Sequence, residues 1–198
     1  MKKVLLFPGA FNPPHLNHVR TLEFAVSNYL FDEVWIMPSG KRNDKTISTS
    51  YEDRRNLNKL FVIYLQSNIA IPIKLITAEL DDKSSRFTEE IIEEVKSQPE
   101  TDITQLIGLD GYLTIEKKLT SKHEKFLVIP RSGYVFQKDL VFDSNITLLS
   151  EDPGNGVSST DIRLMIENED KKYKELIPKD IADYIEKHNL YANSKITS

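Results

Sequence analysis

Two histidines stand three residues apart where a short apolar run gives way to a helical pattern. The segment is Gly9–His18, with the letters GAFNPPHLNH. His15 and His18 could both donate hydrogen bonds to one anion, and Gly9 permits close approach of the backbone to a ligand. The start of the following helix offers unpaired N–H groups and a positive dipole end, which suits a phosphate. An isolated pair of histidines with this spacing is more often solvated. A zinc site is not indicated, because no third ligand stands at a recognisable spacing. The position of the pair at a helix start nevertheless favours phosphate binding.

A second segment lies far along the chain, at Gly156–Arg163, with the letters GVSSTDIR. Ser158 or Ser159 could cap the helix that follows, because a hydroxyl at this position accepts a backbone N–H. The same helix start could bind phosphate oxygens, and Arg163 lies about one turn further on, within reach of the same anion. Taken alone, this pattern is better explained by an ordinary capped helix with a solvated arginine.

Other charged groups carry weaker signals. The segment 39–45 holds three basic side chains: Lys41, Arg42 and Lys45. They could grip a substrate phosphate or the leaving pyrophosphate, although a run of charges in a loop is often only solvated. Arg54 or Arg55 could join this group, although exposed helix arginines are the ordinary expectation. Glu79 and Asp81 could form a paired carboxylate site, but acidic surface is the expected explanation.

The elements that position these residues follow from apolar runs and helical spacing. Strands are predicted at Lys3–Phe7, Glu33–Met37, Ile71–Ile76, Ile103–Ile107, Phe126–Ile129 and Ile146–Leu149. Helices are predicted at His18–Leu30, Tyr51–Gln66, Phe87–Lys96 and Lys179–His188, with two or three helices in all after residue 158. Alternating strands and helices predict a doubly wound α/β fold with a parallel sheet, whose ligands bind beyond the carboxyl ends of the strands. The segments there are 9–18, 38–45 and 108–112.

The bulk composition narrows the function classes. The chain has 198 residues, 39% hydrophobic and 28% charged, which suits one domain over 1–198 with 158–191 as a C-terminal helical part. The formal net charge of −4 argues against a nucleic-acid partner, and the absence of cysteine excludes disulfides and thiolate chemistry. No apolar stretch approaches the roughly 20 residues that cross a bilayer. We therefore expect no membrane partner and a cytoplasmic location.

Together, the two segments resemble the paired signatures of the nucleotidyltransferase superfamily. Residues 9–18 are similar to its G-x-F-D-P-x-H-x-G-H signature, and residues 157–163 to its I-S-S-T-x-I-R signature, in the expected order. Within that superfamily the chain most resembles nicotinate or nicotinamide mononucleotide adenylyltransferases. Further segments carry this resemblance: 108–112 (GLDGY), 128–133 (VIPRSG), 177–191, and 85–88 (SRFT), where the family often has Ser-Tyr-Thr.

Three positions depart from the family pattern. Asn12 replaces the usual aspartate, and Arg86 replaces a tyrosine. Asn17 replaces the glycine between the histidines, and its side chain adds bulk where the family places adenine and ribose. These changes leave adenylyl transfer as the expected chemistry and bear on the identity of the second substrate.

The resemblance implies a Rossmann-like enzyme that transfers AMP from ATP to a mononucleotide and releases pyrophosphate. The implied catalytic residues are His15, His18 and Arg163. The implied ATP-binding residues are Gly9, Ala10, Phe11, Asn17, Gly108, Asp110, Ser158, Ser159 and Thr160. The implied second-substrate residues are Asn12, Ser39, Lys41, Lys45, Thr88 and Arg131. Mg²⁺ is expected to arrive with ATP, bound by phosphates and water rather than by protein ligands.

Several alternatives stay open at the level of the sequence. The same chemistry could serve phosphopantetheine, a cytidylyl acceptor or flavin mononucleotide, and a nucleotide-binding sensor without turnover would keep the same site. The choice between nicotinate and nicotinamide is open, since backbone groups alone can distinguish a carboxylate from an amide. Oligomeric state is equally open, with a homo-oligomer among the alternatives.

Overall fold

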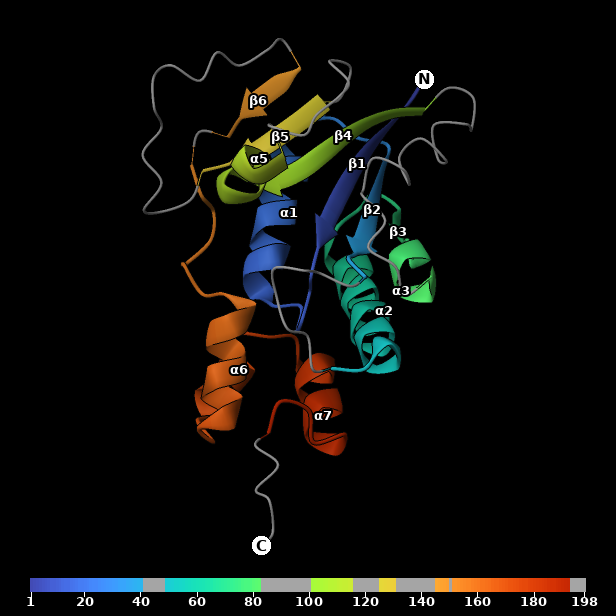
Figure 1. Ribbon diagram of the computed structural model, residues 1–198. Helices are drawn as coiled ribbons and strands as arrows, with labels where there is room; N and C mark the ends of the chain where they lie inside the picture. The colour runs from blue at the N-terminus through green and yellow to red at the C-terminus, as the bar shows by residue number, and fades with distance from the viewer. Residues whose placement is uncertain (41–48, 83–100, 116–124, 131–144, 150, 193–198) are drawn as a thin grey trace, which may run out of the picture.

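A parallel sheet forms the centre of the computed structural model, which describes residues 1–40, 49–82, 101–115, 125–130, 145–149 and 151–192 (Figure 1). Its strands are β1 (Lys2–Gly9), β2 (Glu33–Pro38), β3 (Ile73–Leu75), β4 (Thr101–Gly108), β5 (Lys125–Ile129) and β6 (Ile146–Leu148). Its helices are α1 (Leu16–Asn28), α2 (Tyr51–Asn68), α3 (Ala78–Asp82), α5 (Leu109–Ile115), α6 (Ser159–Glu167), the 3-10 helix η2 (Lys171–Glu175) and α7 (Lys179–Lys187).

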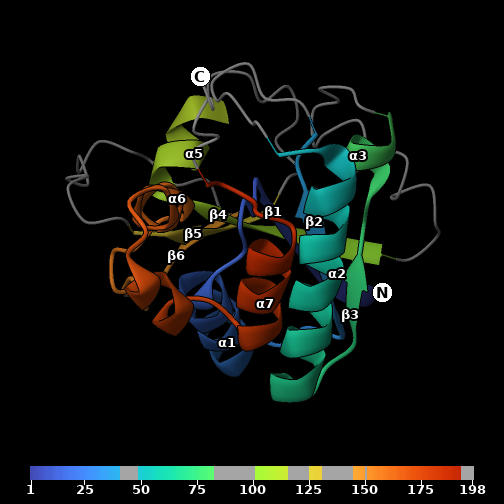
Figure 2. The same cartoon turned by 90° about the horizontal axis from the view of Figure 1, so that it is seen from below.

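The residues of β1 are apolar on both faces because helices cover both sides of the sheet. Leu5 and Phe7 face the larger core, which includes buried residues of α1, α2, α6 and α7. Val4 and Leu6 belong to a second cluster on the opposite face, against which Ala78 at the start of α3 packs. Alternate side chains of a strand point to opposite faces, so a continuous apolar run fits a strand buried on both. Figure 2 shows α1, α2 and α7 together on one side of the sheet.

The strand order is β3-β2-β1-β4-β5-β6, and every pair is parallel. The chain leaves β1 towards β2 in one direction and returns to β4 on the other side, so the order switches beside β1. The pairing of β1 with β2 continues to Gly9↔Pro38, whereas its pairing with β4 ends at Leu6↔Gln105. The strands therefore diverge at their carboxyl ends, where doubly wound folds bind ligands.

The predicted doubly wound α/β fold is confirmed, with local differences in the elements. Helix α1 begins at Leu16 rather than at His18, so His15 occupies its N-cap. Two of the described helices were not predicted: α5, which follows the fourth strand directly, and the short α3. The predicted helix Phe87–Lys96 lies outside the described residues.

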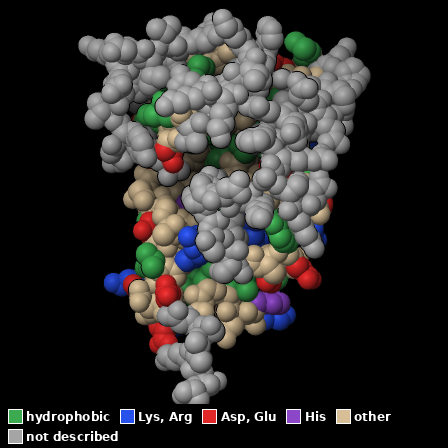
Figure 3. Space-filling view, in the orientation of Figure 1, with side chains coloured by type: hydrophobic (Ala, Val, Ile, Leu, Met, Phe, Trp, Pro, Cys, Tyr) green, Lys and Arg blue, Asp and Glu red, His purple; other side chains and the backbone are tan. Residues whose placement is uncertain are grey.

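None of the helices in the described ranges is long and apolar enough to cross a membrane. On the face shown in Figure 3, acidic and basic side chains of the described residues are interspersed rather than gathered by sign.

A buried carboxylate ties together the amino-terminal ends of three strands. The side chain of Glu33 in β2 is only 1% exposed and forms ion pairs with Lys2 of β1 and Lys74 of β3. The Lys74 Nζ lies 2.7 Å from Glu33 Oε1. Burial opposes ionisation of Glu33, but the hydrogen bonds from Lys2 and Lys74 outweigh it and hold its pKa below the usual range.

We expect Glu33→Gln to destabilise the protein at pH 7 by about 1–2 kcal/mol, because the two half-exposed lysines lose a buried partner. The folded pKa of Glu33 is depressed, so its contribution is fully present above the unfolded value of about 4.3 and is lost as pH falls through the folded value. Urea unfolding of the wild type and of Glu33→Gln between about pH 7 and pH 3 measures the difference in their free energies of unfolding. A difference in unfolding free energy that does not shrink in acid would contradict the ion-pair explanation.

Candidate active site

The two predicted histidines meet at the start of α1. The backbone N–H of His15 donates to Nδ1 of His18 at 3.2 Å. Their imidazole rings stack with centroids 3.7 Å apart and an interplanar angle of 29°. His15 is buried, at the N-cap of the helix. The structure thus brings together the two groups that the spacing indicated, in the first turn of a helix, where the Leu16 N–H donates to the carbonyl of Leu176 and the His18 N–H to that of His15.

An aromatic wall fixes the orientation of His18. The rings of Phe11 and His18 pack edge to face with their centroids 4.9 Å apart. The ring centroids of Phe7 and Phe61 lie 6.1 and 6.2 Å from that of His18. Phe11 is 1% exposed and has a φ of 42°, in the left-handed region that bulky residues avoid. The loop after β1 therefore folds an aromatic side chain inward beneath His18, which restricts where the imidazole can point.

The start of α6 is a capping box. Ser158 is the N-cap, its Oγ accepts the backbone N–H of Asp161 at 3.3 Å, and the Asp161 carboxylate accepts the Ser158 N–H at 2.8 Å. These hydrogen bonds from Ser158 hold the pKa of Asp161 below its usual range, and the attraction of His15 acts in the same direction. The start of α6 is therefore within electrostatic reach of His15, although about 140 residues separate them.

Side chains of α6 attach this helix to the loop between β1 and α1. The Ser159 hydroxyl donates to the carbonyl of Pro13 at 2.8 Å, and Arg163 Nη1 donates to the carbonyl of Asn12 at 2.7 Å. Arg163 Nη2 also donates to Thr160 Oγ1 at 3.1 Å. In Figure 1 the beginning of α6 lies beside the beginning of α1. The two signature segments thus form one site, with two helix N-termini side by side.

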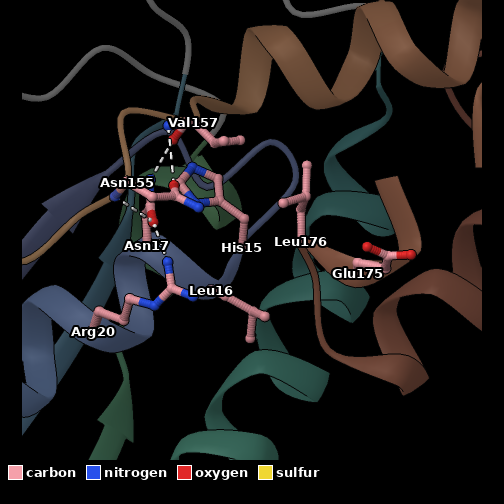
Figure 4. Close-up of a pocket in the computed structure, with 8 residues that line it drawn as sticks. All are labelled: His15, Leu16, Asn17, Arg20, Asn155, Val157, Glu175 and Leu176. Carbon is pink, nitrogen blue, oxygen red and sulfur yellow. Dashed lines mark hydrogen bonds between the residues drawn. The ribbon is translucent and has the colours of Figure 1, made fainter. Parts of the chain in front are cut away.

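Asn17 adds a further connection between the same segments. Its Nδ2 donates to the carbonyl of Val157 at 2.7 Å, and its Oδ1 accepts the N–H of Asn155 at 3.2 Å. Arg20 also donates to Oδ1, and these residues line a small pocket with His15 (Figure 4). The side chain of Asn17, which is larger than the glycine of the family pattern, therefore contacts the segment that leads into α6.

The other side of the loop is attached to β2 by Arg54. Its guanidinium donates to the carbonyls of Ala10 at 3.0 Å and Gly40 at 3.2 Å, and also to that of Ser39. The Ser39 N–H donates to the carbonyl of Gly9 at 2.8 Å. The expectation that Arg54 is exposed is wrong, since only 1% of it is accessible.

The prediction that Arg54 is exposed failed for a physical reason. Arg54 stands three residues before Leu57 and seven before Phe61, which are fully buried, so it belongs to the inward stripe of α2. Its charge suggested solvent, but the carbonyl oxygens of a tight loop need donors. Glu79 is a similar case: it is 4% exposed and accepts the Gly40 N–H at 2.7 Å. Its spacing gave no such signal, and the expectation of acidic surface was wrong for it.

The remaining predicted site residues fall into two groups. Gly108 ends β4, and Asp110 lies in the first turn of α5, at the carboxyl end of the sheet. The other group lies outside the described residues and comprises Lys41, Arg42, Lys45, Ser85–Thr88 and Arg131. Of the residues assigned to the second substrate, the structure therefore places only Asn12 and Ser39.

Comparison with known proteins agrees with the geometry. Residues 6–165 match the model of the cytidylyltransferase-like family, so the fold and the paired segments define a nucleotidyltransferase. A probable nicotinate-nucleotide adenylyltransferase of Bacillus pumilus is 31% identical over 197 residues, which cover 96% of this chain and 99% of the relative. One from Clostridium tetani is 31% identical over 206 residues, covering 96% and 100%. The chain belongs to the nicotinate-nucleotide adenylyltransferase family, and it is an enzyme.

Solved structures share the fold. The Plasmodium falciparum nicotinic acid mononucleotide adenylyltransferase complexed with NaAD superposes with a TM-score of 0.77 at 24% identity, covering 96% of this chain and 98% of that chain. The P. falciparum protein complexed with APC gives a TM-score of 0.74 at 21% identity, with the same coverage. The similarity extends over nearly the whole chain, including the C-terminal helices.

Replacement of Gly9 by alanine tests the packing of the loop. An added Cβ would lie 2.9 Å from Phe11 Cζ, and the Phe11 ring is enclosed by the aromatic wall and His18. We expect Gly9→Ala to destabilise the fold by about 1–3 kcal/mol and to lower turnover about 10- to 100-fold as the ring displaces His18. Thermal unfolding and steady-state kinetics measure both. Turnover at the wild-type rate would show that the orientation of His18 does not depend on this contact.

Proposed function

We propose that this protein transfers the AMP moiety of ATP to nicotinate mononucleotide and releases pyrophosphate, a step of NAD biosynthesis. The observation that carries the proposal is the docking of α6 on the loop after β1, which gathers His15, His18 and Arg163 beside two helix N-termini. The names of relatives at 31% identity over nearly the whole chain support the choice of acceptor.

The chemistry is an in-line displacement at the α-phosphorus of ATP. An oxygen of the mononucleotide phosphate attacks, the bond from the α-phosphorus to the bridging oxygen breaks, and pyrophosphate leaves. A phosphate monoester has a second pKa of about 6, so it is already ionised and needs no protein base. The site supplies position and positive charge, which are the main requirements of transfer to phosphorus.

Within this proposal His18 and Arg163 stabilise the charge that develops on the α-phosphate, and His15 binds the triphosphate. The hydroxyls at the start of α6 already have partners: Ser158 is bonded to Asp161, and Ser159 to the carbonyl of Pro13. The Ser158 N–H is likewise bonded to Asp161, so we assign phosphate binding there to the backbone N–H groups of Ser159 and Thr160. The side chains of the signature then hold the helix start in place.

Mg²⁺ fits this site as a companion of the nucleotide. Within the described part of the chain, no three His, Asp or Glu side chains gather as a protein-built metal site requires. We expect phosphate oxygens and water to hold the ion, because Mg²⁺ keeps several waters and binds substrate phosphates rather than all-protein cages. When bound, it neutralises part of the charge on the triphosphate and the leaving pyrophosphate.

The end of β2 offers a group for the second substrate. The Ser39 Oγ is a buried atom with no hydrogen-bond partner among the residues that the structure describes. A buried hydroxyl usually has a partner, and leaving it without one is unfavourable. We propose that Ser39 bonds the acceptor mononucleotide, next to Gly9 and Ala10, and that Asp110 binds a ribose hydroxyl of ATP.

The proposed reaction is tested by pyrophosphate release with MgATP and four acceptors: nicotinate mononucleotide, nicotinamide mononucleotide, phosphopantetheine and flavin mononucleotide. We expect the fastest release with nicotinate mononucleotide and a dinucleotide product by mass spectrometry. Release with another acceptor alone would keep the chemistry and overturn the substrate. ATP binding without release across the panel would indicate a nucleotide sensor.

His18→Ala tests the division of roles at the helix start. We expect the turnover number to fall about 10²- to 10³-fold, while the affinity for ATP changes far less, because the hydrogen bond of His18 strengthens in the transition state. His188→Ala is the matched control, since that ring stacks on Tyr184 of α7 rather than on His15 or the aromatic wall around His18. An equal loss of ATP affinity and turnover in His18→Ala would overturn the role.

A further inference from the structure

The turn that follows α7 contacts the loop after β1. Tyr191 lies 179 residues after Asn12, and its hydroxyl donates to Asn12 Oδ1 at 2.6 Å. The backbone of Tyr191 has a φ of 63°, a left-handed conformation that is unfavourable for an aromatic residue. Such conformations persist where surrounding contacts determine them, and they concentrate at functional sites.

The phenol of Tyr191 lies among charged groups of the site. Burial raises the pKa of Tyr191 to about 12, while a hydrogen bond with Thr49 and the nearby Arg163 and Arg54 act in the opposite direction. The hydroxyl is therefore protonated at neutral pH and acts as a donor. The phenol of Tyr191 is close enough to Arg163 and Arg54 to be influenced by their charges. The turn that follows α7 therefore contacts the same loop that these two arginines contact.

Asn12 is held at two points. Its side-chain oxygen accepts from Tyr191, and its backbone carbonyl accepts from Arg163 Nη1 at 2.7 Å. Asn12 is itself only 4% exposed. A shift of the Asn12 side chain would therefore move the carbonyl that orients the guanidinium of Arg163. The amide of Asn12 links the C-terminal turn to the group assigned to the transition state.

We propose that Tyr191 is a positioning residue for AMP transfer: through Asn12 it fixes the direction in which Arg163 presents its guanidinium. This inference rests on the proposed function, because it takes Arg163 as the stabiliser of the α-phosphate. Tyr191 itself acts through Asn12 and touches neither substrate in this proposal. It would explain why a residue beyond the last helix adopts a strained backbone to reach the loop.

The test compares Tyr191→Phe, which removes only the hydroxyl, with Tyr173→Phe. Tyr173 is a buried tyrosine of η2 whose hydroxyl bonds Glu186, so the control loses an equivalent group away from Asn12. We expect Tyr191→Phe to lower the turnover number about 10- to 100-fold with nearly unchanged KM values. Tyr173→Phe should reduce the melting temperature and leave turnover unchanged. A raised KM with normal turnover in Tyr191→Phe would overturn the positioning role.

A double variant separates positioning from general destabilisation. If Tyr191 acts through Arg163, Tyr191→Phe should cost little further turnover in an Arg163→Lys background, and additive losses would overturn the proposal. The ¹⁵N resonance of Arg163 Nε, assigned from its absence in Arg163→Lys, gives a readout without catalysis. It should move in Tyr191→Phe and stay in place in Tyr173→Phe. If the Arg163 resonance does not move in Tyr191→Phe, the positioning role is wrong, even if the wild-type protein transfers AMP. If the wild-type protein is inactive, that result contradicts the proposed function and not the positioning role.

Discussion

The loop between β1 and α1 turns tightly, and its carbonyl oxygens accept hydrogen bonds from side chains of distant elements. Arg54 of α2 bonds the carbonyl of Ala10, Arg163 of α6 that of Asn12, and Ser159 of α6 that of Pro13. Buried backbone acceptors need partners, so the loop holds this shape only while both helices are docked on it. The same bonds bring the N-termini of α1 and α6 side by side. Two positive helix ends are unfavourable neighbours without an anion between them, so the contacts that position the loop also favour the phosphate binding that we propose there.

The sheet determines where this loop can form. Because β1 stays paired with β2 to its last residue but leaves β4 after Leu6, its carboxyl end turns away from β4 at the switch in strand order. Gly9 allows Phe11 to fold back under the loop, since a Cβ there would lie 2.9 Å from the ring. The ring then orients His18. Gly9 thus influences the orientation of His18 through the packing of Phe11. The side chain of His18 is therefore held in place before a ligand binds.

The parts of the site that could be predicted from the sequence are those whose signal is local. The spacing of His15 and His18, and the capping pattern at Ser158, indicate helix starts without knowledge of the fold, and the alternation of strands and helices indicates that both lie at ligand-binding positions. The helical spacing of Arg54 indicated the inward stripe of α2, but its charge suggested solvent, since its acceptors are backbone carbonyls elsewhere in the chain. Glu79 could not be placed at all, because its burial depends on the N–H of Gly40. The sequence around Tyr191 gave no local signal of its contact with Asn12, because the two residues are 179 positions apart. Residue types indicate what a side chain can bond, whereas only the tertiary structure shows which loop requires it.

Asn17 illustrates how this chain modifies the signature without losing its geometry. A glycine between the histidines leaves space, whereas the carboxamide here bonds both the carbonyl of Val157 and the N–H of Asn155. This bridge joins the same two segments that Ser159 and Arg163 join, so α6 is docked on both sides of its first turn. A carboxamide, with one donor end and one acceptor end, matches a neighbouring carbonyl and N–H, which a carboxylate of the same shape could not do. The substitution therefore replaces open space with a directed contact that fixes the segment leading into α6.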